Sequence, residues 1–197
     1  MYKYEQELIN KGIKYIAGCD EAGRGPMAGP VVAAACILPL NYKNDLIDDS
    51  KKLTEKKREL AFEQIKKDAI AFDIQIISAE EVDRLNPKEA SRVAMTNAIK
   101  SLNPQPEHIL VDFETVYVDI DQQGIKKGDS LSLTIAAASI LAKVTRDRIM
   151  VEYAKEFPNY GFEKHKGYVT KMHREALEKY GVTKIHRKSY KPVQKFL

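Results

Sequence analysis

Cysteine is scarce in this sequence, which contains only Cys19 and Cys36 among 197 residues. Two thiols are too few for a disulfide framework or for a four-ligand zinc site, so both of these stabilising devices are excluded. Each cysteine lies in an apolar run that predicts a central strand. We therefore expect two buried, reduced cysteines.

Long apolar runs are absent as well. The sequence nowhere reaches the roughly 20 consecutive apolar residues that cross a bilayer, and its first seven residues carry charges where a secretory signal is apolar. We expect a cytoplasmic protein that does not associate with membranes. Internal repeats and low-complexity segments are also missing.

With 44% hydrophobic residues, the chain has enough apolar side chains for one sizeable core, and we expect one main domain and a monomer.

A strong excess of one charge is also lacking. The chain has 32 Lys and Arg residues against 28 Asp and Glu, a net charge of +4, which by itself does not indicate a nucleic-acid partner. The last third of the chain is richer in basic side chains: Lys164, His165, Lys166, Lys171, Arg174, Lys184, His186, Arg187, Lys188, Lys191 and Lys195. This concentration fits a surface that follows a phosphate backbone, and it fits a solvated lysine-rich face equally well.

The most informative stretch is residues 15–38, where an apolar run ends in Asp20 and Glu21 and a glycine-rich turn leads into a second apolar run. Neighbouring side chains of a strand point to opposite faces, so both carboxylates can meet only where the strand ends. Two carboxylates held that close repel or share a cation, and hard divalent cations prefer oxygen ligands. The pattern predicts a magnesium-type site, with an exposed acidic turn as the alternative.

The turn Gly23-Arg24-Gly25 differs from a dinucleotide-binding fingerprint, because Pro26, Pro30 and a Val/Ala run follow it and predict a strand instead of a helix. Glycines allow a ligand to approach the backbone closely, and an arginine can reach a phosphate. This turn therefore suits a nucleic-acid backbone.

Periodicity and end signals predict an α/β domain with a mixed sheet of about five strands flanked by helices. The expected helices are a short one within 1–14, then 55–67 with Thr54 as N-cap, 79–85, 88–102, 130–157 with Ser130 or Ser132 as cap, and 170–180. The expected strands are the two apolar runs within 15–38, then 69–77, 108–112 and 115–120, with a loop at 124–128.

Two further carboxylates stand at ends of predicted elements: Asp112 closes a buried strand and Asp129 precedes the long helix. With Asp20 and Glu21 they make four carboxylates, enough to hold two hard cations for an in-line displacement at phosphorus by water. Asp147 is a rival acid, but its basic neighbours predict an ion-paired structural residue. The histidines His108, His165, His173 and His186 show no ligand spacing beside these acids, so we assign them no metal role.

These motifs resemble bacterial ribonuclease HII, the type 2 ribonuclease H family. The resemblance is carried by six blocks: Asp20–Pro26, Asp49–Leu53, Val111–Asp112, Lys127–Ser130, Ala136–Arg148 and Tyr160–Tyr168. It implies a ribonuclease H-like fold and an endonuclease that cuts the RNA strand of RNA/DNA hybrids. It also implies nicking on the 5′ side of single ribonucleotides in duplex DNA, leaving 3′-hydroxyl and 5′-phosphate ends, with Mg²⁺ or Mn²⁺ as cofactor and a role in ribonucleotide excision repair.

The resemblance also implies roles for individual residues. Asp20, Glu21, Asp112 and Asp129 would bind the metal ions; Gly23, Arg24 and Gly25 would contact the 2′-hydroxyl through the backbone; and Tyr168 would stack on the next deoxyribose. The alternative for Tyr168 is an aromatic side chain half-buried against the last helix. The weaker candidates for substrate contacts are Lys51, Lys52, Ser139, Lys143, Arg146 and Lys166.

Residues 1–157 are expected to form the catalytic domain, and residues 158–197 a helical segment of the same functional domain that clasps the duplex. Two residues depart from the family pattern. Glu114 either intrudes on the metal site or points into solvent, and Leu131 replaces a common lysine, which removes one phosphate contact. Residues 193–197 begin like a peptide that binds a sliding clamp, although a solvated or packed tail is the favoured interpretation.

Two other functions remain open from the residues alone. A nucleic-acid-binding module without catalysis would leave the four carboxylates unexplained. A different metal-dependent phosphoryl-transfer enzyme is possible because a fold does not fix a function.

Overall fold

A mixed five-stranded sheet forms the centre of the computed structural model, which describes all residues 1–197. The strands are β1 (Ile16–Ala22), β2 (Val31–Ile37), β3 (Ala71–Ile77), β4 (His108–Asp112) and β5 (Asp121–Ile125), in the order β3-β2-β1-β4-β5. The pairs β1–β2 and β2–β3 are antiparallel, whereas β1–β4 and β4–β5 are parallel. This is the mixed sheet that the sequence predicts.

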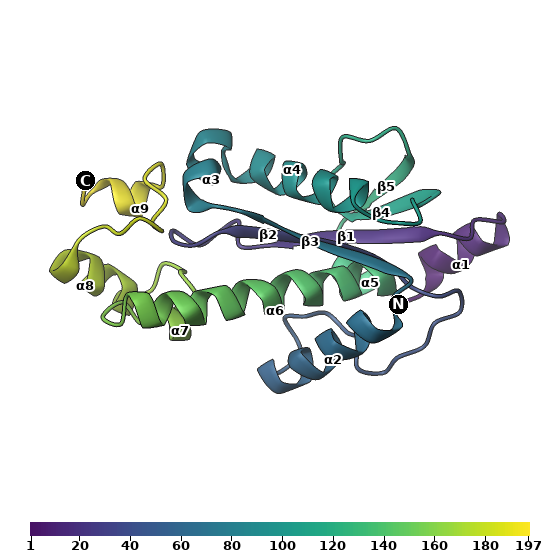
Figure 1. Cartoon of the computed structure of the whole chain (residues 1–197), viewed down its shortest axis with the longest axis horizontal. Coiled ribbons are helices and arrows are strands. Elements are labelled where there is room, and N and C mark those ends of the chain that lie inside the picture. The colour runs from purple at the N-terminus through teal and green to yellow at the C-terminus, as the bar shows by residue number, and fades with distance from the viewer.

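Helices cover both faces of the sheet (Figure 1). On one face lies α4 (Pro87–Lys100), preceded by α3 (Ala79–Leu85); on the other lies the long α6 (Leu133–Glu156), with α2 (Glu55–Asp68) packed outside it. Because side chains alternate along a strand, Cys19 faces the α4 core and Cys36 the α6 core. Both cysteines are buried and free, as predicted.

The strand β1 and the helix α6 touch at a glycine. A Cβ atom built on Gly18 would lie 2.2 Å from the carbonyl carbon of Thr134 and 2.5 Å from the amide nitrogen of Ile135. No side chain fits between the two backbones. The start of α6 is thereby fixed against the strand that carries Asp20.

Most of the predicted elements are confirmed, including α3 and β4 with the same ends and the cap of α2, where the Thr54 hydroxyl accepts from the Lys57 amide at 3.3 Å. The fifth strand was predicted wrongly. Residues 115–120 form an irregular segment with bends, and β5 begins directly after it at Asp121 and ends within the predicted loop 124–128. The amide of Val116 donates to the Gln122 side chain at 2.8 Å instead of to a strand, while the Val116 side chain is buried in the α4 core.

The long helix begins later than predicted. Residues Gly128–Leu131 form a separate short helix, α5, and α6 starts after Ser132, whose hydroxyl accepts from the Ile135 amide at 3.2 Å. Asp129 therefore lies within α5 and not directly at the start of the long helix.

The chain ends pack at opposite ends of the molecule (Figure 1). At one end lies α1 (Lys3–Asn10); at the other lie α7 (Phe162–His165), α8 (Lys171–Tyr180) and α9 (Lys191–Gln194). The C-terminal tail is packed and not solvated at Val193, which is fully buried against Met27 and Leu177. None of the helices is both long and apolar enough to cross a membrane.

Candidate active site

A cavity of about 380 Å³ opens at the carboxyl ends of the parallel strands β1 and β4. Its walls come from five separate parts of the chain and consist of Asp20, Glu21, Ala22, Gly23, Arg24, Gly25, Ser50, Lys51, Asp112, Ser139, Lys143, Arg146 and Tyr168. Parallel strands end at the same edge of a sheet, which is why residues distant in sequence converge here. Of the predicted site residues, only Lys52, Asp129 and Lys166 lie outside this wall.

Asp129 nevertheless adjoins the cavity. Its Oδ2 accepts from Nζ of Lys51 at 2.8 Å, and the preceding residue, Gly128, donates its amide hydrogen to Asp112 Oδ1 at 2.6 Å. The short helix α5 thus brings Asp129 beside Asp112. All four predicted carboxylates therefore gather around one cavity.

The electrostatics of these carboxylates favour a cation. Burial raises the pKa of the Asp20 carboxyl well above its ordinary value, and the charges of Glu21, Asp112 and Asp129 raise it further. Burial is also the main cause that raises the pKa values of Glu21 and Asp112. An added divalent cation would remove this repulsion.

Glu21 supplies a second indication. Its Oε2 atom is buried and has no hydrogen-bond partner, whereas its Oε1 atom lies 3.4 Å from Nη1 of Arg24. A buried carboxylate oxygen without a partner is costly. The oxygen-only donor set and this free oxygen fit a hard divalent cation such as Mg²⁺ or Mn²⁺, although no three of these side chains already form a closed ligand set.

Glu114, one of the two departures from the family pattern, does neither of the things that the sequence suggested. Its side chain is 8% exposed, and its carboxylate lies 3.5 Å from Arg24 Nη1 and 3.9 Å from Lys88 Nζ. It therefore holds Arg24 at the rim of the cavity. The second departure, Leu131, is exposed on α5.

Two buried arginines hold the glycine-rich turn and the residues that follow it. Arg146 donates to the carbonyl oxygens of Ala28, Pro30 and Lys166 at 2.8–3.0 Å. Arg187 donates to those of Gly23, Arg24 and Gly29 at 2.6–3.0 Å. Arg187 was not among the predicted site residues, because no local sequence pattern marks an arginine whose partners are carbonyl groups more than 150 residues away.

The remaining candidates have varied surroundings. Arg146 is 1% exposed, so a phosphate contact would require it to release a carbonyl group. The Ser139 hydroxyl lies 2.9 Å from that of Ser50. Lys143 pairs with Asp147 at 2.9 Å, which confirms the ion-paired role predicted for Asp147. Lys52 is exposed, and Lys166 bonds the Glu163 carbonyl through its ammonium group.

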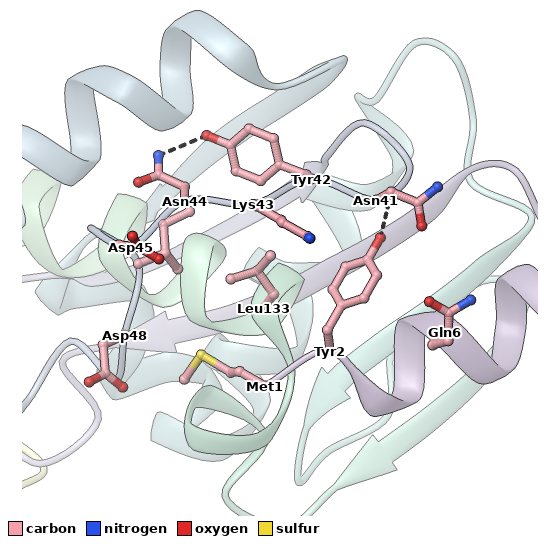
Figure 2. Close-up of a pocket in the computed structure, with 11 residues that line it drawn as sticks. Met1, Tyr2, Gln6, Asn41, Tyr42, Lys43, Asn44, Asp45, Asp48 and Leu133 are labelled. Carbon is pink, nitrogen blue, oxygen red and sulfur yellow. Dashed lines mark hydrogen bonds between the residues drawn. The ribbon is translucent and has the colours of Figure 1, made fainter.

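A second cavity, of about 680 Å³, lies between the N-terminal residues and the loop that follows β2 (Figure 2). The Tyr2 hydroxyl accepts from the Asn41 amide at 2.8 Å, and the Tyr42 hydroxyl accepts from Asn44 Nδ2 at 2.9 Å. Both tyrosine hydroxyls of this cavity thus have partners within its lining, and none of the predicted site residues line it. Although it is larger, this cavity lacks the cluster of predicted metal-binding carboxylates found at the ends of β1 and β4.

Known proteins resemble this chain in both sequence and fold. The family model for ribonuclease HII matches residues 17–193. A ribonuclease HII from Bacillus subtilis is 53% identical over 196 residues, which is 100% of this chain and 77% of that protein. The solved ribonuclease H2 from Pyrococcus horikoshii superposes with a TM-score of 0.80 at 26% identity, covering 92% of this chain and 96% of the other.

A further solved structure, the complex of PCNA and ribonuclease HII from Archaeoglobus fulgidus, matches with a TM-score of 0.72 at 25% identity, over 90% of this chain and 95% of that one. The fold is therefore ribonuclease H-like. Given the family model and relatives that are about half identical over nearly the whole chain, this chain belongs to the ribonuclease HII family of nucleases, which hydrolyse phosphodiester bonds.

Proposed function

We propose that this enzyme cuts the RNA strand of RNA/DNA hybrids and nicks duplex DNA on the 5′ side of a single embedded ribonucleotide, leaving 3′-hydroxyl and 5′-phosphate ends. The observation that carries this proposal is the convergence of Asp20, Glu21, Asp112 and Asp129 beside the glycine-rich turn. Such an activity would serve the removal of ribonucleotides from DNA.

The four carboxylates would hold Mg²⁺ or Mn²⁺, with Glu21 Oε2 as a ready donor because it has no partner in the protein. Two bound cations would supply Lewis acidity toward the attacking water and the leaving oxygen. Asp20 and Asp129 are 4% and 3% exposed, so the surrounding core fixes their positions. No side-chain nucleophile is required.

Recognition of the ribose is assigned to the glycine-rich turn. Gly23 has φ +96°, and a Cβ there would lie 2.2 Å from Arg146 Nε, so the fold itself requires this glycine. Gly25 is exposed, has no positive φ, and its nearest neighbour to an added Cβ is Tyr168 Cε1 at 3.5 Å. Because the fold does not explain the glycine at 25, close approach of a ligand is the better explanation.

Tyr168 stands across from Gly25 and is 45% exposed, as a side chain that stacks on a sugar would be. It belongs to residues 158–197, which we propose as the segment that clasps the duplex. A clamp contact through residues 193–197 would require Val193 to leave its buried site, so the proposal includes no clamp.

The experiment that tests this function uses a labelled DNA duplex with one ribonucleotide, an all-DNA duplex as control, and Mg²⁺ or Mn²⁺. The parent is expected to nick only the ribonucleotide duplex, on the 5′ side of the ribonucleotide, and Asp112→Asn is expected to abolish nicking. Tight binding without nicking in either metal would instead identify a binding module. Equal cutting of both duplexes would point to a different nuclease.

Gly25→Ala separates substrate recognition from folding. The variant should keep the parent's melting temperature, because surface changes without strain alter stability by no more than about 0.5 kcal/mol. Its affinity for the ribonucleotide duplex should fall about tenfold, or ~1.4 kcal/mol, because the added methyl group blocks the backbone. Anisotropy titrations in Ca²⁺ measure this affinity. An unchanged affinity would show that the substrate does not approach Gly25.

A further inference from the structure

We propose that the adjacent residues His186 and Arg187 form one positioning unit that holds both walls of the substrate site: the turn Gly23–Gly25 and the loop that carries Tyr168. This inference rests on the proposed function, because it explains how the groups assigned to ribose recognition are oriented. Neither residue lines the cavity. Both would act through backbone groups.

The first wall depends on Arg187. Its side chain is completely buried and donates to the carbonyl oxygens of Gly23 at 2.6 Å, Arg24 at 3.0 Å and Gly29 at 3.0 Å, and to the Tyr190 hydroxyl at 2.8 Å. The Tyr190 hydroxyl also donates to the Arg24 carbonyl, at 2.5 Å. Burying a cation is expensive, and the hydrogen bonds to the carbonyl groups of the turn offset this cost.

The orientation has a direct consequence for the amide groups. In a trans peptide the C=O and N–H bonds point in opposite directions. Because the Gly23 and Arg24 carbonyls point toward Arg187, the N–H groups of Arg24 and Gly25 point away from it. Neither N–H donates a hydrogen bond within the protein. Two backbone donors are thus left free at the cavity for the oxygen atoms of a ribose or phosphate.

The second wall depends on His186 through a chain of hydrogen bonds. The Thr183 amide can only donate, so His186 Nδ1 accepts from it at 3.0 Å, and the ring hydrogen of His186 is on Nε2. That hydrogen is donated to His173 Nε2 at 2.9 Å. His173 then carries its hydrogen on Nδ1 and donates to the Tyr168 carbonyl at 2.9 Å.

Packing fixes the rings of this chain. The Phe162 ring packs edge to face against the His173 ring, with 5.4 Å between ring centroids, and its centroid lies 5.8 Å from that of the His186 ring. Burial lowers the pKa of His173 to about 3 and of His186 to about 4, so both rings are neutral at physiological pH and each keeps one donor nitrogen and one acceptor nitrogen. The loop with Tyr168 is therefore tied to His186, the residue next to the Arg187 that ties the glycine-rich turn.

Two more contacts join these residues to the turn. The Arg187 amide donates to the Met27 carbonyl at 2.9 Å, and His186 forms an isolated β-bridge with Ala28. The backbone at 186–187 thus runs directly beside the residues that follow the turn. A shift of this dipeptide would move both walls together.

Arg187→Lys tests the first wall, because lysine keeps the charge but cannot bond three carbonyls as the planar guanidinium does. We measure affinity in Ca²⁺ for a duplex with one ribonucleotide and for an all-DNA duplex. The preference for the ribonucleotide should fall about tenfold, with the all-DNA affinity unchanged, since tenfold is the effect of one lost charge-assisted bond. Lys188→Met, which removes an exposed neighbouring charge, should leave the preference intact.

His186→Asn tests the second wall. Its Oδ1 can still accept from the Thr183 amide, but the shorter side chain cannot reach His173. Ribonucleotide affinity should fall about tenfold, and His186→Asn combined with Tyr168→Ala should weaken binding no more than Tyr168→Ala alone, because both variants remove the same contact. This cycle decides the proposal even if Arg187→Lys fails to fold.

Additive losses in the cycle, or an Arg187→Lys variant that weakens both duplexes equally, would reduce these residues to a general structural role and overturn the inference. The proposed function is judged separately by the parent. If the parent nicks the ribonucleotide duplex while the variants keep its preference, only the inference fails. If the parent shows neither nicking nor preference, the proposed function itself has failed.

Discussion

Asp20→Asn is expected to lower the cleavage rate on the order of 10³-fold while making the metal-free protein more stable. The rate falls because the carboxylate would no longer hold a cation whose Lewis acidity is worth several kcal/mol, and each ~1.4 kcal/mol is a factor of ten. The stability rises because a buried charge that is repelled by Glu21, Asp112 and Asp129 is removed. Relief of such active-site strain commonly adds about 0.5–2 kcal/mol.

The measurement is urea unfolding with EDTA and again with Mg²⁺, beside single-turnover cleavage. In EDTA the variant should unfold at higher urea than the parent, and in Mg²⁺ the parent should gain more stability than the variant, because binding to the folded state stabilises it. Asp119→Asn removes a charge from an exposed turn and should change neither quantity. A variant that is less stable than the parent in EDTA would show that repulsion from the neighbouring carboxylates does not destabilise the protein at Asp20.

Gly18→Ala should have the largest effect on folding. The added Cβ would lie 2.2 Å from the carbonyl carbon and 2.4 Å from the oxygen of Thr134, and these backbone atoms cannot rotate away. Overpacking a core typically costs about 1–3 kcal/mol, and a clash of two backbones should reach at least the upper end. The start of α6 would also be pulled away from Glu5, whose Oε1 accepts from the Thr134 amide at 2.9 Å.

Urea unfolding measures this loss, with Gly12→Ala as the control. Gly12 has φ +87° but no atom within 4 Å of an added Cβ, so its replacement should cost only about 1 kcal/mol of backbone strain. Equal losses for the two variants would mean that β1 and α6 are free to separate. That result would contradict the close packing that places Asp20 beside the start of α6.

Asp20 and Asp112 were predictable because each follows an apolar run, and neighbouring parallel strands bring such positions to one edge of a sheet. In the structure β1 continues past Asp20 to Ala22, and its parallel pairing with β4 stops just before the two carboxylates, at Cys19 and Val111. The strand at 115–120 was predicted wrongly because Val116 and its neighbours alternate as in a strand, yet they bury their side chains from an irregular segment. The true edge strand, Asp121–Ile125, is mostly exposed and therefore carries no apolar alternation.

The support of the site could not be predicted in the same way. Arg187 and His186 act on backbone groups far away in sequence, and such contacts depend on the tertiary fold and not on a periodic pattern. Glu114 was expected either to enter the metal site or to point into solvent, because its ion pair with Arg24, 90 residues earlier, cannot be recognised from the local sequence. Local reasoning therefore located the carboxylates that line the cavity and missed the residues that hold the walls around them.

The bonds between Arg187 and the glycine-rich turn also bear on the order of events during synthesis. The turn leaves the ribosome early, but Arg187, which donates hydrogen bonds to the carbonyl oxygens of Arg24 and Gly23, lies 163 and 164 residues later in the chain. Contacts of such long range form late, after the local elements have folded. A growing chain thus displays Asp20 and Glu21 long before the turn Gly23–Gly25 takes its final shape, and the cavity at the end of β1 stays incomplete until Arg187 has emerged.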